Sequence, residues 1–150
     1  MNRKRLIYFT DLVFLPLFVL SFYSGMELHI AGHGTEHEIW HNWAVFHTIA
    51  GLFFALSGII HVKTHWAWYK GLKAKRWKGK SKIVLLLSGV FACMAGTGIL
   101  LLFCIDGANS FTGLLHYTTG IIMGVLGIAH ILGRIHRLYN VVNSHVARSE

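Results

Sequence analysis

The chain is poor in charged residues, above all acidic ones, and this scarcity excludes most soluble folds. Of its 150 residues only 13% are charged, with 6 Asp and Glu against 14 Lys and Arg, while 54% are hydrophobic. A soluble globular domain carries about 25% charged residues. Such a domain also leaves few large apolar patches in contact with water. The composition therefore predicts a chain that lies largely within a lipid bilayer.

Proline and cysteine are also scarce. Pro16 is the only proline, and it should kink a helix unless neighbouring groups replace the hydrogen bond that it removes. Cys93 and Cys104 are the only cysteines. They lie several turns apart on one predicted helix, so they cannot form a disulfide with each other. The chain has no C-x-x-C-H motif, which excludes the covalent attachment of a c-type haem.

Long apolar runs make up most of the chain. A membrane-spanning helix needs about 20 mainly apolar residues. Four runs have this length, namely Leu6–Met26, Trp43–Trp68, Ile83–Cys104 and Thr112–Leu138. The short connections between them favour an up-down-up-down four-helix bundle. We expect an all-α membrane protein with one transmembrane domain over residues 1–150, ending in a short frayed or surface-lying tail over Tyr139–Glu150.

The charges are divided between alternate connections. Basic residues gather before the first run, around the second connection and after the fourth run, as Arg3, Lys4, Arg5, Lys70, Lys73, Lys75, Arg76, Lys78, Lys80, Lys82, Arg134, Arg137 and Arg148. The other two connections carry the acidic residues Glu27, Glu36, Glu38 and Asp106 and contain no Lys or Arg. The positive-inside rule then places both termini and the middle loop in the cytoplasm. Topology and contact with anionic lipid explain the basic loop, so we expect no nucleic-acid partner.

Two of the runs carry the same pattern, H-x3-G-x6-G-x2-H. Its members are His47, Gly51, Gly58 and His61 in the second run, and His116, Gly120, Gly127 and His130 in the fourth. At about 100° per residue, each set lies on one narrow helix face, with its two histidines roughly 21 Å apart. Ser24-Gly25 in the first run is loosely echoed by Thr97-Gly98 in the third. The fold therefore looks like a duplicated helix pair.

The repeated histidines predict two bound cofactors. A polar side chain at membrane depth is costly and usually functional. Two parallel helices with matched histidines can supply an imidazole above and below each iron of two b-type haems. The expected axial ligands are His47 with His116 for an outer haem and His61 with His130 for an inner haem. The four glycines of the repeat would leave flat space for the macrocycles. Bis-imidazole ligation leaves no open iron position, which suits electron transfer.

The stretch Trp43–Lys70 carries a more specific resemblance. Its His47 and Gly51, with the closing run HVKTHWAWYK from His61, are similar to the flavinylation-associated cytochrome family. The paired histidine spacing also resembles the di-haem core of respiratory b-type cytochromes. Membership implies a small four-helix protein of the bacterial cytoplasmic membrane that passes electrons outward to flavin-bearing proteins or another redox carrier. We expect an electron-transfer protein rather than a stand-alone enzyme, with a quinol or a partner subunit as donor.

Three residues near the cytoplasmic ends leave alternatives open. His65 lies on the same face as His47 and is an alternative ligand to His61, although its repeat counterpart is Arg134. Arg134 is either a partner for a haem propionate or a positive-inside anchor. Asp11 could assist proton uptake at a quinone site. The preferred interpretation pairs Asp11 with one of the nearby basic residues, Arg3, Lys4, Arg5 or Arg134.

A second set of histidines lies in the first outer connection. His29, His33, His37 and His41 recur every fourth residue. On a continuous helix they would form a stripe able to bind a transition metal. Gly32 and Gly34 oppose a continuous helix and favour a polar interfacial loop, and a place near the outer haem edge or a docking partner is a third interpretation.

Two other functions stay open on the sequence alone. One is a histidine-rich membrane protein that binds or transports a transition metal. The other is a non-catalytic anchor subunit of a redox complex. Neither explains the 14-residue spacing of the histidines or the matched glycines.

Overall fold

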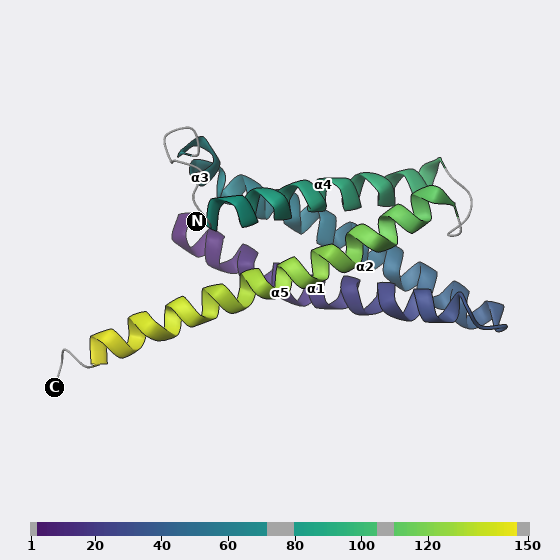
Figure 1. Cartoon of the computed structure of the whole chain (residues 1–150), viewed down its shortest axis with the longest axis horizontal. Coiled ribbons are helices and arrows are strands. Elements are labelled where there is room, and N and C mark those ends of the chain that lie inside the picture. The colour runs from purple at the N-terminus through teal and green to yellow at the C-terminus, as the bar shows by residue number, and fades with distance from the viewer. Residues whose placement is uncertain (1–2, 72–79, 105–109, 147–150) are drawn as a thin grey trace.

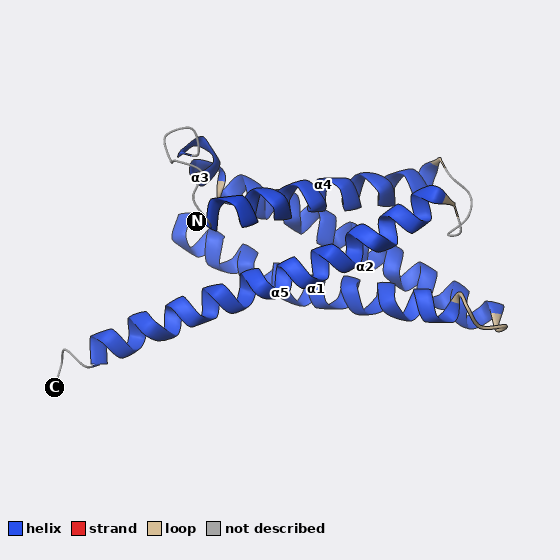
Figure 2. Ribbon diagram, viewed as in Figure 1, coloured by secondary structure: helices blue, strands red, loops and turns tan. Residues whose placement is uncertain are grey.

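The computed structural model describes residues 3–71, 80–104 and 110–146, and within these ranges the chain is helical apart from short turns. The helices are α1 (Arg3–Ala31), α2 (His37–Thr64), α3 (Trp66–Lys70), α4 (Lys80–Phe103) and α5 (Phe111–Val146) (Figures 1 and 2). The four long helices form a bundle in which successive helices reverse direction (Figure 1). This confirms the predicted all-α four-helix architecture.

The bundle is built from two helix pairs. Helix α1 packs along α2 and α4 packs along α5, and the contacts between the two pairs are less extensive. Because each pair is a hairpin, α2 and α5 run in the same direction (Figure 1). This is the arrangement expected of a duplicated helix pair, and it places equivalent positions of the two repeats at similar depths.

All four long helices contain a segment suited to a bilayer. The segments Leu6–Ala31, His37–Thr64, Lys82–Phe103 and Phe111–Arg134 are long and apolar enough to cross a membrane. The exposed surface is apolar, with side chains such as Leu12 and Ile49 about half accessible, whereas Ser24 is fully buried. Small polar residues between helices with large apolar ones outside are typical of a protein surrounded by lipid.

Two helix ends differ from those predicted. The second predicted run extended to Trp68, but α2 ends at Thr64 because His65 leaves helical geometry, with φ −93° and ψ 10°. The short α3 then follows as a separate helix. At the other end, the backbone of α5 stays helical to Val146, so the predicted tail from Tyr139 continues the fourth helix as far as that residue. Helix α1 passes through Pro16 without interruption.

The buried core lies between the two histidine levels. Phe18, Phe54 and Met123 form it, and Phe14 and Phe91 are among the residues that pack against it. Phe54 is only 2% exposed and lies midway between His47 and His61 along α2. Aromatic rings therefore separate the two levels at which the structure places the predicted ligands.

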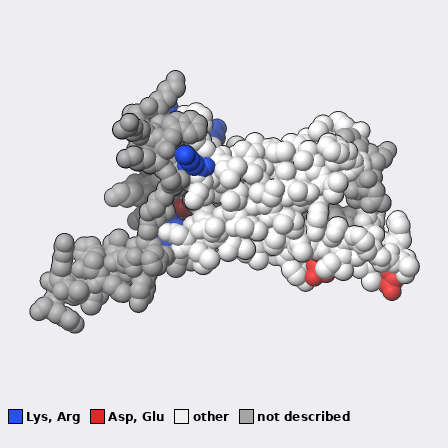
Figure 3. All heavy atoms as spheres, viewed as in Figure 1, with Lys and Arg blue, Asp and Glu red and all other residues white. Residues whose placement is uncertain are grey.

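Charged side chains lie at the two ends of the bundle. The described basic residues near the end that carries α3 are Lys63, Lys70, Lys82 and Arg134, and those of opposite sign at the other end are Glu27, Glu36 and Glu38. Figure 3 shows a long surface without charged side chains, drawn white, between these two ends. The charge asymmetry seen in the sequence is therefore also an asymmetry of the fold.

Candidate functional site

His47 on α2 and His116 on α5 meet inside the bundle. Their ring centroids are 6.1 Å apart and their ring planes cross at 71°. The two histidines occupy the same position in the two repeats, and the parallel course of α2 and α5 brings them to one level (Figure 1). The structure therefore juxtaposes the first two predicted ligands.

The His47 ring is held in one tautomer by Ser24 of α1. The Ser24 hydroxyl lies 3.1 Å from His47 Nδ1 and 3.1 Å from the carbonyl oxygen of Ser21. A carbonyl can only accept, so the hydroxyl donates its proton to Ser21. The hydroxyl oxygen then accepts from His47, which places the ring proton on Nδ1. Nε2 keeps its unshared electron pair, as a metal ligand requires.

The His116 ring is fixed in the same way by α4. Its Nδ1 lies 3.0 Å from the carbonyl oxygen of Met94 and 3.1 Å from the Thr97 hydroxyl. Thr97 donates to the carbonyl of Cys93 at 2.9 Å. Because a carbonyl cannot donate, His116 Nδ1 carries the proton. Both rings of the pair therefore present Nε2 as the nitrogen available to a ligand.

A glycine beside each ring makes room for it. A Cβ atom at Gly25 would lie 3.0 Å from His47 Cε1, and a Cβ atom at Gly98 would lie 3.0 Å from His116 Cε1. Each of these glycines directly follows the residue whose hydroxyl bonds the same ring. The similar dipeptides Ser24-Gly25 and Thr97-Gly98 therefore have the same structural role, because each contacts a histidine ring in its own half of the fold.

The His47–His116 pair has the spacing that a shared metal ion requires. Metal–imidazole bonds of about 2.0–2.1 Å put two coordinating nitrogens about 4 Å apart across one ion, and their ring centroids on the order of 6 Å apart. The observed separation is 6.1 Å. Both Nδ1 atoms are already occupied by the protein, as is usual for histidine ligands of metals. The pair therefore fits bis-imidazole ligation.

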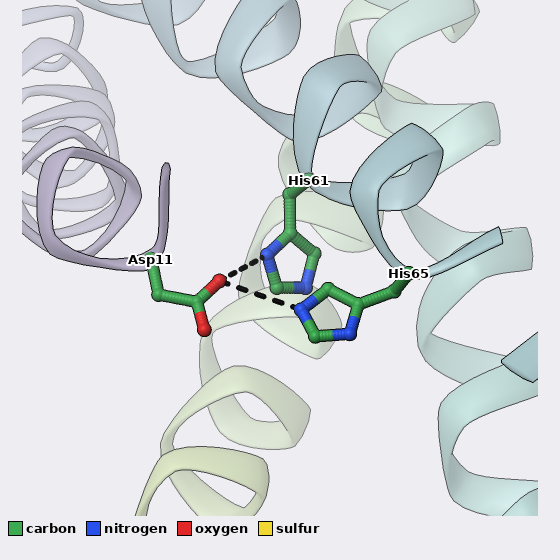
Figure 4. A group of neighbouring side chains, drawn as sticks. All are labelled: Asp11, His61 and His65. Carbon is green, nitrogen blue, oxygen red and sulfur yellow. Dashed lines mark hydrogen bonds and ion pairs between the residues drawn. The ribbon is translucent and has the colours of Figure 1, made fainter. Parts of the chain in front are cut away.

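His61 lies further along α2 and has a charged partner. Its Nδ1 is 2.8 Å from Asp11 Oδ1 on α1, and His65 Nε2 is 3.6 Å from the same oxygen (Figure 4). Phe14 stacks on the His61 ring with centroids 5.0 Å apart. An ionised carboxylate only accepts, so His61 Nδ1 carries the proton and Nε2 keeps its electron pair. We refer to the side chains of Asp11, His61 and His65 as the Asp11–His61–His65 cluster.

The cluster has the donor set of a small metal site. Its three donor atoms lie within 4.8 Å of one another. His65 Nε2 is buried and has no hydrogen-bond partner, although the Asp11 carboxylate is nearby. Two imidazoles and one carboxylate are common ligands of Zn²⁺ and of non-haem iron. Among the described residues this is the one group of three or more His, Cys, Asp or Glu side chains whose donor atoms lie this close together. His65 therefore stays a candidate ligand beside His61.

Asp11 has two contacts among the described residues, with His61 and His65, and the sequence predicted neither. The expected pairing of Asp11 with a basic residue stays a prediction. The side chains of Arg3, Lys4 and Arg5 lie outside those that the structure describes. The antiparallel course of α1 and α2 explains the observed contacts, because it sets the start of α1 against the end of α2. One sequence signal pointed to this. Asp11 and Ser24 are 13 positions apart, close to the 14 that separate His47 and His61.

The fourth predicted ligand reaches the level of His61. His130 on α5 lies near enough to His61 for the charges of the two rings to influence each other. Arg134, one turn further along α5, is exposed at the same end of the bundle. Its assignment to a haem propionate stays a prediction.

The glycines predicted to accommodate a cofactor differ in their surroundings. They are Gly51, Gly58, Gly120 and Gly127. A Cβ atom at Gly58 would meet the phenyl ring of Phe91 on α4, and one at Gly127 would meet that of Phe18 on α1. The first glycine of either motif has no neighbour closer than 3.9 Å. Close ring packing therefore involves Gly58 and Gly127, whereas a Cβ atom at Gly51 would meet only Ser21 and one at Gly120 would have no neighbour within 4 Å.

The outer histidines are divided between two helices and a turn. Helix α1 ends at Ala31 and α2 begins at His37, so the expected interruption by Gly32 and Gly34 is confirmed. The His29 ring stacks on Tyr117 of α5 with centroids 3.9 Å apart. The other members of the set are His33 in the turn and His37 and His41 on α2. They form no continuous helical stripe, and their role in metal binding stays a prediction.

Comparisons of the chain with family models, with curated proteins and with solved structures found no match.

Proposed function

We propose that this protein is a di-haem b-type membrane cytochrome that carries electrons across the bilayer. The observation that carries the proposal is the His47–His116 pair, whose rings are 6.1 Å apart with both Nδ1 atoms held by the protein. These two histidines would hold one haem. His61 and His130 would hold the other, with the two levels separated by the aromatic core.

A haem held between two imidazoles supplies a one-electron carrier whose iron has no open position. The chain contributes the orientation and the surroundings. Ser24 and Met94 fix the rings of the first pair and Asp11 fixes His61. Such partners set ring orientation and ligand basicity, and an apolar shell limits the access of water. Phe54 and its neighbours supply that shell between the levels.

The charge distribution supports an orientation and a set of partners. The end with Lys63, Lys70 and Lys82 would face the cytoplasm of a bacterium, and the end with Glu27 would face outward. Electrons would then leave near His47 for an extracytoplasmic flavin-bearing protein or another redox carrier. A quinol or a partner subunit would donate near His61. The resemblance to flavinylation-associated cytochromes supports the same partners, and it favours an electron-transfer protein or subunit over a stand-alone enzyme.

Transfer across a membrane can be measured in vesicles that contain the purified protein. The vesicles enclose ferricyanide, and dithionite is added outside. We expect bleaching of the enclosed ferricyanide to be faster than in protein-free vesicles, and to fall to that background with His116→Ala. Vesicles that hold a protein with both haems, yet bleach no faster than empty ones, would contradict the transmembrane role.

A second candidate function is the binding or transport of a transition metal. The Asp11–His61–His65 cluster favours it, because three donor atoms lie within 4.8 Å and one of them is buried without a hydrogen bond. Metal analysis of the purified protein separates the two functions. Iron in the form of haem supports the cytochrome, whereas stoichiometric Zn²⁺, Cu²⁺ or Ni²⁺ without haem supports the metal-binding protein.

A further inference from the structure

The two histidine levels differ in the charge of the groups that hold their rings. At the His47–His116 level the partners of Nδ1 are the Ser24 hydroxyl, the Thr97 hydroxyl and the Met94 carbonyl, which are all neutral. At the other level the partner of His61 is a carboxylate oxygen at 2.8 Å. The two histidines of α2 are therefore held by residues of α1 that differ in charge, Ser24 at one level and Asp11 at the other.

A carboxylate partner changes what an imidazole does to a metal. A hydrogen bond to an ionised acceptor is shorter and about twice as strong as one between neutral groups. It draws the Nδ1 proton away from the ring and raises the basicity of the other nitrogen as a ligand. The carboxylate also places a negative charge near the metal in a medium of low dielectric constant. Both effects favour the more highly charged, oxidised state of a metal bound to His61.

We propose that Asp11 sets the direction of electron flow by holding the His61 level at a lower reduction potential than the His47–His116 level. This inference rests on the proposed function. Transfer from the His61 level to the His47–His116 level moves one electron, and no bond is made or broken. The favourable direction runs from the end that carries α3 to the end that carries Glu27, which is outward in the proposed orientation.

His65 also lies near the Asp11 carboxylate. Its Nε2 lies 3.6 Å from the same Asp11 oxygen that His61 contacts, and its ring lies 4.6 Å from the His61 ring (Figure 4). Asp11 Oδ1 therefore faces two imidazoles, and it is hydrogen-bonded to that of His61.

The test is a potentiometric titration of the purified protein and of Asp11→Asn. The amide has the same shape but no charge, so the lower of the two potentials should rise. Hydrogen-bond partners of metal ligands typically change metal affinity by about 10- to 100-fold. If the equilibrium constant for reduction of this haem changes by tenfold, its potential shifts by about 59 mV, so we expect a rise on the order of 59 mV in the lower potential. The higher potential should not move. Glu27→Gln is the control on the same helix, because it removes a carboxylate near the opposite end of α1 from Asp11, and the lower potential should stay unchanged.

A second variant keeps the test decisive if Asp11→Asn loses a haem. His116→Ala leaves Asp11 intact, and the haem that it retains should have the lower potential. Two haems with potentials that Asp11→Asn does not move would overturn this inference and leave the proposed function standing. Retention of the higher-potential haem in His116→Ala would do the same. A folded protein that holds no haem would overturn the proposed function, and this inference with it.

Discussion

His47→Ala should purify with about one haem per chain, half the content expected of the unchanged protein. Alanine removes one of two axial imidazoles at that level, and the opposite His116 cannot hold the iron from both sides. The Ser24 hydroxyl would remain with no ring to orient. The measurement is haem content by the pyridine haemochrome method, together with a redox titration in which one of two components disappears.

His41→Ala is the matched control for this experiment. It removes a histidine from the same helix, and His41 is exposed near the start of α2. Its haem content should equal that of the unchanged protein. A His47→Ala protein that keeps two haems with unchanged spectra would contradict the ligand assignment. Loss of bound metal in His41→Ala, with no effect of His47→Ala, would favour the outer histidines as a metal site.

Gly98→Leu should weaken the same haem without removing a ligand. A Cβ atom at this position already lies 3.0 Å from His116 Cε1, so a larger side chain must displace the ring. Overpacking of a well-packed site costs about 1–3 kcal/mol. If that cost falls on the ring orientation, haem affinity should fall on the order of 10- to 100-fold. A haem titration of the apo-protein, followed by visible absorbance, measures the change.

Gly96→Leu provides the comparison, because it lies two residues away on the same helix. A Cβ atom at Gly96 has no neighbour within 4 Å, so leucine should be accommodated there. The two variants have the same composition and differ in which side of α4 carries the added side chain. Equal haem affinity in both would show that the position of the His116 ring does not limit binding, which would contradict its role as a ligand.

The bundle and the first histidine pair were predictable from the sequence because each follows from a local regularity. Four apolar runs of sufficient length fix four helices when lipid is the solvent. Equal spacing of histidines on two parallel helices fixes a shared level, since the rise per residue is constant. The meeting of His47 and His116 needed only these two facts. The similarity of Ser24-Gly25 and Thr97-Gly98 is also visible in the sequence. Their contact with the histidine rings becomes clear only when α1 is placed against α2 and α4 against α5.

The partners of His61 could not be predicted in the same way. Helix α1 is apolar on most sides, so its sequence does not show which face turns toward α2. The contact between Asp11 and His61 depends on that rotation, as does the stacking of Phe14. The end of α2 at Thr64 was missed for a related reason. The apolar and aromatic residues continue to Trp68, and no glycine or proline marks the turn at His65.

The most direct measurement of haem binding is the haem stoichiometry of the detergent-purified protein. The sample is expressed with adequate haem supply and shown to be folded by circular dichroism. A reduced-minus-oxidised visible spectrum with low-spin b-type bands, and about two haems per chain by pyridine haemochrome, is the predicted result. A folded protein with no haem would contradict the claim, and stoichiometric zinc, copper or nickel in its place would make the Asp11–His61–His65 cluster the functional site.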